Sequence, residues 1–479
     1  MSAPDSADQD GERPFERPSD LPGEPRIIPR PEHDISRKNI SKEALKVLYR
    51  LMNKGFKAYL VGGGVRDLYL GKTPKDFDVG TDARPSRMKK LFRNCRIIGR
   101  RFRIAHVFFP DDSIVEVATF RRGEVHAVQK ASGVVLLDNQ YGTAEEDAKR
   151  RDLTINGLFY DPETFSIIDY VGGVDDLNNR IVRTIKPPDV SFQEDPVRMI
   201  RALRHSARTG FVIEEDTLQG IYRNRLEIQK ANPSRLMEEV FRDLRGGAAV
   251  SYFRKLVETH LLDAFIPTLA QQLRDHGLDH PLFRRLEVLD QWTANGRELS
   301  NPVLVSVLLQ SVLLPDPGLW SGEQPNPPGV WPLLQNGFQE ISTHLRVSRR
   351  DFERVVQSLL AFRKLRQFHE RGELKTSYQN KTYLAEALDF LEIDLLSLGQ
   401  ETPLIDEWRA NFVKESNSNR RTGFLRHRRS RRRGMRGGAR RRPRSDAPKT
   451  DTAANQSTSA STSGSPRRKR RRRRRKKKT

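Results

Sequence analysis

Two aspartates, Asp76 and Asp78, stand two positions apart in a segment that reads as a β-strand, Asp76–Val79. Residues i and i+2 of a strand point to the same face, so the two carboxylates would lie side by side and repel each other. A pair of Mg²⁺ ions removes that repulsion, and two metal ions held by carboxylates serve in-line displacement at a nucleotide phosphate. An exposed acidic turn explains the same residues, so the pair alone leaves both interpretations open.

A glycine run, Gly62 to Gly64, lies a dozen residues before the aspartates, between a β-rich run at Ala58–Val61 and a helical stretch at Val65–Leu70. Backbone amides of a glycine-rich turn at a helix N-terminus can hold phosphate, and Arg66 adds a charge-assisted contact. A tight turn that packs the helix on the sheet accounts for the same glycines.

Glu116 lies in a further expected strand, Ile114–Phe120, on the face that carries Ile114, Ala118 and Phe120. A carboxylate on an apolar face needs a partner. The pattern predicts either a third metal ligand or an ion pair with Arg121.

The segment from Arg150 to Asn156 brings together two guanidiniums, which suit a triphosphate, and two side chains that suit a sugar. If the segment is helical, Asp152 and Asn156 are four residues apart on one face and can address one ribose. A solvated helix face is the alternative.

Asp195 and Arg198 stand at the start of a strong helix, Pro196–Arg208, with Arg201 one turn further on. Three residues apart, the pair presents an acceptor beside a donor. Adenine and cytosine offer the complement on their pairing edges, whereas guanine and uracil offer the reverse. The pair predicts selection of ATP or CTP, although a simple salt bridge at the helix start has the same signature.

The elements around these residues predict an α+β fold. Mixed strands and helices fill the chain to about residue 185, and helical periodicity dominates after Pro187 and Pro188. We expect a disordered segment at 1–35, a mixed α and β domain at 36–185, a small helical domain at 186–250, a helical body at 251–415 and a disordered tail at 416–479. His33 falls in the first segment and is interpreted as incidental.

The charge of the chain is concentrated at one end. Residues Ser416 to Thr479 hold 26 of the 86 Lys and Arg residues and two of the 62 acids, so the other 415 residues balance at 60 basic and 60 acidic. Such a tail grips nucleic-acid phosphates without regard to sequence. The single cysteine, Cys95, fits a cytoplasmic location, and the longest apolar stretch is too short and polar to cross a membrane.

The order and spacing of the five motifs resemble the class II nucleotidyltransferases, the family of bacterial poly(A) polymerases and CCA-adding tRNA nucleotidyltransferases. The resemblance covers residues 36 to 260 closely and the rest to about 415 more loosely. It implies a palm domain at 36–185, a neck at 186–250, and RNA 3′ ends, ATP and two Mg²⁺ ions as substrates and cofactor.

The resemblance also implies roles for individual residues at the positions that match the family's motifs. The resemblance implies that Asp76 and Asp78 bind the catalytic metals and that Glu116 and Asp152 are active-site acids. It implies nucleotide contacts from the residues Gly62, Gly63, Arg66, Arg151, Asn156, Asp195, Arg198 and Arg201.

The segment Leu91–Val107, with Gly99–Phe102 at its centre, resembles the poly(A) polymerase branch. We therefore expect a poly(A) polymerase that also binds RNA through Arg100, Arg101, Arg103, Arg431, Arg432, Arg470 and Arg471. A CCA-adding enzyme is the nearest alternative, and a non-catalytic RNA-binding protein is an alternative of another class. An oxidoreductase is disfavoured because the glycine run lacks the full dinucleotide fingerprint.

Overall fold

The computed structural model describes residues 24–99, 103–122, 126–130, 133–137, 140–313, 330–372, 378 and 381–410. The chain divides into two units, Met1–Ser416 and Asn417–Thr479, and every described residue belongs to the first. The predicted basic tail and the first 23 residues therefore lie outside the described part of the chain.

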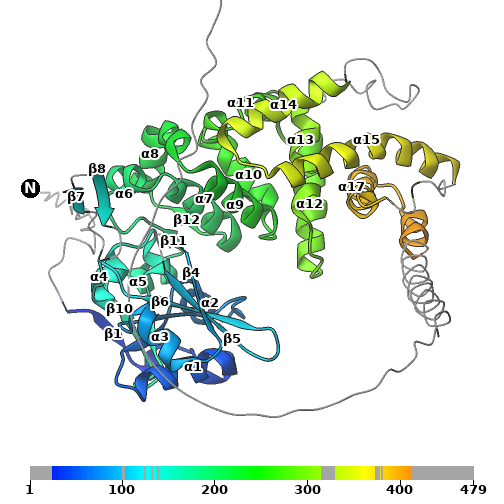
Figure 1. Ribbon diagram of the computed structural model, residues 1–479. Helices are drawn as coiled ribbons and strands as arrows, with labels where there is room; N and C mark the ends of the chain where they lie inside the picture. The colour runs from blue at the N-terminus through cyan, green and yellow to red at the C-terminus, as the bar shows by residue number, and fades with distance from the viewer. Residues whose placement is uncertain are drawn as a thin grey trace, which may run out of the picture. The chain divides into compact units, whose positions relative to one another are not determined.

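The N-terminal domain is built around a β-sheet (Figure 1). The sheet has eight strands, in the order β1-β10-β9-β2-β3-β6-β5-β4. All of its neighbouring strands pair antiparallel except β3 and β6, which are parallel. Its strands are β1 (Arg26–Ile28), β2 (Ala58–Val61), β3 (Asp78–Thr81), β4 (Cys95–Ile98), β5 (Ile104–Phe108), β6 (Ile114–Thr119), β9 (Phe159–Asp161) and β10 (Ser166–Asp169). The mixed α and β palm predicted from the sequence is confirmed.

Helices α1 (Lys42–Met52) and α3 (Pro85–Leu91) pack on the sheet through its buried side chains, among them Val79 and Val117. The Ser41 hydroxyl accepts the Ala44 N–H at 3.1 Å and so caps the N-terminus of α1. Because side chains alternate along a strand, the neighbours Asp78 and Glu116 face the opposite side of the sheet. The remaining short helices of this domain are α2 (Gly63–Tyr69), α4 (Ala144–Lys149) and α5 (Gly173–Asn178), and a separate hairpin pairs β7 (His126–Lys130) with β8 (Gly133–Leu137).

The segment from residue 24 to residue 35 is ordered, although we expected disorder up to residue 35. Strand β1 pairs with β10, and Ile28 and Ile35 are buried in the core. His33 is buried as well, and its Nε2 donates to the Phe165 carbonyl at 3.0 Å. The two isoleucines and the extra strand stabilise a segment whose composition alone looked unstructured.

Strand β3 starts at Asp78, two residues later than expected. Its partner β2 ends at Val61, which pairs with Asp78, because Gly62 turns the chain at a φ of 71°. Without a partner strand beyond Gly62, Asp76 lies in the preceding loop. The assumption that both aspartates occupy one strand was therefore wrong.

The chain after Pro187 is helical, as predicted, and two short parallel strands, β11 (Ile181–Val182) and β12 (Val212–Ile213), join its start to the palm side. Its helices are α6 (Pro188–Glu194), α7 (Val197–Thr209), α8 (Glu215–Asn224), α9 (Pro233–Leu244), α10 (Ala249–Glu258), α11 (Pro267–His276), α12 (Pro281–Ala294), α13 (Asn301–Leu313), α14 (Val330–His344), α15 (Arg349–Arg371) and α17 (Leu384–Ser397). No helix among the described residues has the length and apolar character needed to cross a membrane.

Candidate active site

Asp78 and Glu116 lie next to each other at the parallel junction of β3 and β6. The register pairs Val79 with Val117, so the two acids are neighbours one residue earlier. Asp78 is open to solvent on one side, but the surrounding protein and the charge of Glu116 raise its pKa to about 6. Arg151 opposes this rise in the pKa, and Asp76 adds to it from the preceding loop. The sheet thus gathers negative charge at the predicted position.

Glu116 pairs with His106, whose Nε2 lies 3.2 Å from its Oε1. We had considered Arg121 as its ion-pair partner. His106 stands directly opposite Glu116 in the antiparallel β5–β6 register, whereas Arg121 follows the end of β6. His106 was not predicted as the partner of Glu116, because the sequence pattern does not give the register between β5 and β6.

The described protein side chains do not by themselves provide a full set of metal ligands at this site. In the part of the chain that the structure describes, no group of three or more His, Cys, Asp or Glu side chains is placed to hold a metal ion. Mg²⁺ does not need such a group, because it is commonly bound by one or two carboxylates together with substrate phosphates and water. The oxygen donors and unbalanced charge of Asp76 and Asp78 fit that ion.

The raised pKa of Asp78 predicts a stability difference in metal-free protein. Ionising Asp78 costs more free energy in the folded protein than in the unfolded chain, and above pH 6 the group is ionised in both. Asp78→Asn should therefore raise the unfolding midpoint at pH 7.5 by roughly 1–2 °C. As the pH falls through about 6, Asp78 takes up a proton in the folded state and the difference should shrink, with most of it gone near pH 4. Thermal unfolding in EDTA measures it, and a difference that grows at low pH would contradict the prediction.

Gly62 allows Arg151 to approach the glycine turn. A Cβ at this position would lie 2.9 Å from Arg151 Nη1, and the φ of 71° also favours glycine. The Gly62 N–H donates to the Leu158 carbonyl at 3.1 Å, so this amide is engaged within the protein. Arg151 itself is held by Asp147 at 3.0 Å, and its positive charge acts to lower the pKa of Asp78.

Arg66 is buried and tied into the palm. Its Nε and Nη2 donate to the Asp67 carboxylate at 2.8 and 2.7 Å, and its Nη1 donates to Asn156 Oδ1 at 2.7 Å. Direct contacts of Gly63 and Arg66 with a triphosphate stay predictions, because no nucleotide is present.

Asp152 and Asn156 come together, but not through the expected helix. Helix α4 ends at Lys149, and residues Thr154–Asn156 form a single 3₁₀ turn. Asn156 Nδ2 still donates to Asp152 Oδ1 at 3.3 Å, and Arg201 Nε donates to Asp152 Oδ2 at 2.6 Å. Burial alone would raise the pKa of Asp152, but the charge of Arg201 and the hydrogen bonds from Arg201 and Asn156 hold the pKa below its usual range.

Arg201 also starts a buried ion network inside the neck. It reaches Glu239 of α9 at 3.5 Å, Glu239 contacts Arg204, and Arg204 reaches Asp243 at 3.3 Å. The network links the palm acid Asp152 to two helices of the neck. The sequence pointed to Arg201 but not to its partner Glu239, which lies almost 40 residues further along the chain.

The expected side-chain pair between Asp195 and Arg198 is replaced by two other contacts. Asp195 accepts both terminal nitrogens of Arg235, at 2.9 and 2.7 Å, and Arg198 donates to Ser191 and to the Arg150 carbonyl. Asp195 follows the last residue of helix α6, and its Oδ1 also accepts the N–H of Val197, the first residue of α7, at 3.3 Å. A carboxylate acceptor still stands near guanidinium donors, now with Arg235 as a member that the sequence missed.

Several predicted RNA contacts fall outside the described residues: Arg100, Arg101, Arg431, Arg432, Arg470 and Arg471. Arg103 is described, and it is exposed just before β5.

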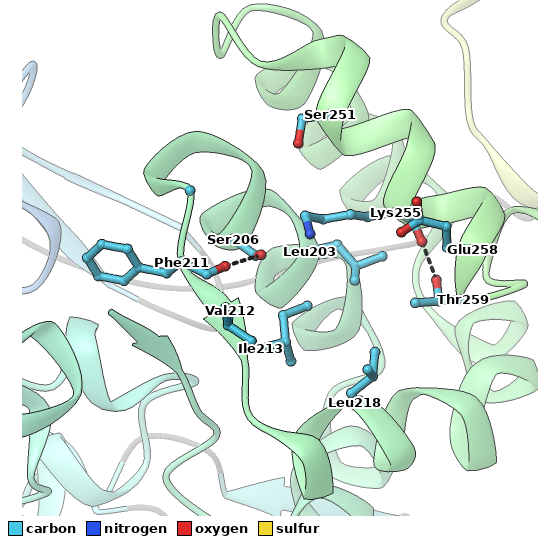
Figure 2. Close-up of a pocket in the computed structure, with 11 residues that line it drawn as sticks. Leu203, Ser206, Phe211, Val212, Ile213, Leu218, Ser251, Lys255, Glu258 and Thr259 are labelled. Atoms are coloured by element: carbon cyan, nitrogen blue, oxygen red, sulfur yellow. Dashed lines mark hydrogen bonds between the residues drawn. The ribbon is translucent and has the colours of Figure 1, made fainter. Parts of the chain in front are cut away.

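A separate hollow lies in the neck, between the end of α7, β12, α8 and α10 (Figure 2). Its volume is about 310 Å³, and Leu203, Ile213 and Leu218 line it together with Lys255 and Glu258. None of the predicted catalytic residues lines it, so we do not assign the nucleotide to this hollow.

Comparison with known proteins identifies two regions of the chain. Residues 58–183 match the family model of the poly A polymerase head domain, and residues 210–273 match the model described as the probable RNA and SrmB-binding site of polymerase A. The first match holds Asp76, Asp78, Glu116 and Asp152. The second begins within the neck.

Full-length relatives agree with these matches. Poly(A) polymerase I of Escherichia coli O6:H1 is 47% identical over 268 residues, which cover 54% of this chain and 57% of that protein. The CCA-adding enzyme of Bacillus velezensis is 32% identical over 221 residues, covering 46% and 54% of the two chains. This chain therefore matches only a little more than half the length of either relative.

A solved structure described as a tRNA-processing enzyme in apo form I has a TM-score of 0.51 and 23% identity, covering 80% of this chain and 91% of the other, which supports the fold. The fold and the arrangement of the acidic residues resemble the catalytic part of a class II nucleotidyltransferase, and residues 58–183 and 210–273 match the two poly A polymerase family models. The head-domain match and the 47% identity show that this part of the chain is similar to bacterial poly(A) polymerase I.

Proposed function

We propose that this chain is an RNA 3′-polyadenylating enzyme that transfers AMP from ATP and releases pyrophosphate. One observation carries the proposal. Asp78, with a raised pKa, stands beside Glu116 on the sheet and near Asp76 and Arg151, inside the segment that matches a poly A polymerase head domain. An accumulation of carboxylates next to an arginine suits a metal-bound triphosphate.

In this reaction the RNA 3′-hydroxyl loses its proton to water and its oxygen forms a bond to the α-phosphorus of ATP. The bond from that phosphorus to the oxygen that bridges it to the β-phosphorus breaks, and pyrophosphate leaves with the electron pair of that bond. Asp76 and Asp78 would hold two Mg²⁺ ions, which when bound supply Lewis-acid stabilisation of the attacking and leaving oxygens. Arg151 places positive charge beside the same carboxylates, and Asp152 and Asn156 offer an acceptor and a donor to the ribose. The partners of the enzyme are thus ATP and RNA 3′ ends, in a cytoplasmic role in RNA processing.

Polyadenylation is favoured over CCA addition by the similarity to poly(A) polymerase I, 47% against 32%. The Asp195 site does not separate the two, since adenine and cytosine offer the same pairing pattern. We therefore propose to offer the full chain either tRNA lacking its CCA end or an unstructured RNA, with ATP or CTP separately. Repeated AMP addition to both RNAs supports the proposal, whereas CTP incorporation followed by a single A on tRNA would overturn it.

A non-catalytic RNA-binding protein that works through its basic tail is the rival of another class. Deletion from Ser416 onward separates the two, because it removes 26 cations and leaves the unit that holds every predicted catalytic residue. We expect metal-dependent AMP transfer to continue, with the KM for RNA raised by about a hundredfold at 50 mM salt. The shortened enzyme should also show a flatter dependence of this KM on salt. Loss of all activity and binding together would favour the rival.

A further inference from the structure

His205 is a buried side chain of the neck helix α7 that touches two palm residues of the candidate nucleotide site. Its Nδ1 lies 3.2 Å from Arg66 Nη1, and its Nε2 lies 3.2 Å from Asn156 Nδ2. Only 6% of the residue is exposed. His205 lies in the helix predicted at Pro196–Arg208, but none of the five motifs includes it.

The two contacts cannot both be satisfied by the ring. Arg66 Nη1 can only donate, and Asn156 presents its Nδ2 donor to His205 because its Oδ1 already accepts from Arg66 at 2.7 Å. A neutral imidazole has one acceptor nitrogen. One N–H, from Arg66 or from Asn156, is therefore left over in a buried site, where an unpaired donor is costly.

The ring is held in its neutral form. Burial lowers the pKa of His205 well below its ordinary value, and the charges of Arg66, Arg204 and Arg201 lower it further, against the opposing charge of Asp152. A protonated ring would have no acceptor for either donor. His205 therefore works as a fixed acceptor that aligns its neighbours.

Asn156, which His205 contacts, forms together with Asp152 a complement to a hydroxyl group. Asp152 supplies an acceptor and Asn156 supplies a donor, joined at 3.3 Å, and a hydroxyl both donates and accepts. We propose that His205 is a positioning residue for ribose selection, which orients the Asn156 amide beside Asp152 so that this pair can bind the 2′-hydroxyl of the incoming nucleotide. This inference rests on the proposed function, in which the nucleotide is ATP.

The test compares the kcat/KM for ATP with that for 2′-deoxy-ATP in single-nucleotide addition by the full chain. A site that hydrogen-bonds a hydroxyl rejects the analogue that lacks it. We expect the wild type to prefer ATP, His205→Phe to lower the ATP-to-dATP ratio by about tenfold, and His205→Gln to restore it to within about threefold, because Gln keeps one acceptor and one donor. The ratio does not depend on the folded fraction, since both nucleotides are measured on the same preparation.

Two further variants keep the test decisive. Asn156→Asp has nearly the same shape but no N–H donor, so it should lose the same preference even if His205→Phe does not fold. His280→Phe is a matched control, because it removes another buried histidine whose Nδ1 accepts the Leu282 N–H at 3.2 Å, far from this site in the sequence. It should lower stability and leave the ratio unchanged.

An unchanged ratio in His205→Phe or Asn156→Asp, or a wild type that uses both nucleotides equally, overturns the inference. A ratio in His205→Gln as low as in His205→Phe also overturns it. If the wild type incorporates neither nucleotide, the proposed function itself fails.

Discussion

Asp78→Asn is expected to abolish AMP incorporation while RNA binding persists. The variant removes the carboxylate that stands beside Glu116 and near Arg151, and with it a ligand for the ions that would balance the triphosphate charge. We expect the rate of AMP transfer to fall by about 10⁴-fold or more, which corresponds to about 5.5 kcal/mol of transition-state stabilisation. Incorporation of labelled ATP into RNA and a separate RNA-binding titration measure the two properties.

Asp112→Asn is the matched control for this loss. Asp112 lies in the turn between β5 and β6 with a φ of 61°, a conformation that Asn adopts as readily as Asp. The Asp112→Asn substitution removes one carboxylate from the same domain without changing the candidate site, so the activity of this variant should stay within about twofold of the wild type. Activity of Asp78→Asn close to that of Asp112→Asn would refute the two-metal mechanism.

The sequence was most informative where local pattern decides the structure. Strands, helices and the N-cap at Ser41 follow from periodicity and capping chemistry, and the motif order indicated which acids to examine. The boundary of β3 was wrong, because it depends on where the partner strand ends and therefore on Gly62. The local sequence pattern does not show where the neighbouring strand ends.

Side-chain partners were the least predictable feature of the site. His106, Arg235 and Glu239 each complete a contact that begins at a predicted residue, yet none stands within its motif. Strand register brings His106 to Glu116, and the packing of α9 brings Arg235 and Glu239 to the start of the neck. Such contacts depend on tertiary packing, so only the three-dimensional structure could show them.

The packing of α9 also supports the second large expectation, that Arg201→Ala destabilises the protein and impairs catalysis together. Arg201 donates to Asp152 at 2.6 Å and lies 3.5 Å from Glu239, and both carboxylates are buried. Removing one member of a buried ion pair leaves uncompensated charge, which costs about 3 kcal/mol even though other donors remain. We expect the unfolding free energy to fall by that amount and kcat/KM to fall by about a hundredfold, because Asp152 loses the donor that fixes it.

Arg223→Ala separates this effect from the loss of any arginine. Arg223 pairs with Asp189 at 3.0 Å, but both side chains are half exposed, so the change should cost less than about 1 kcal/mol and leave catalysis unaffected. The losses of stability and of kcat/KM in Arg201→Lys should lie between those of Arg201→Ala and Arg223→Ala. Lysine keeps the charge but not the planar geometry that reaches both carboxylates. Chemical denaturation gives the stability change, and single-nucleotide addition at a temperature where every variant is folded gives the catalytic change. If Arg201→Ala matched Arg223→Ala in both measurements, the ion network would have no part in holding Asp152, and the link between the palm acid and the neck helices would have to come from apolar packing alone.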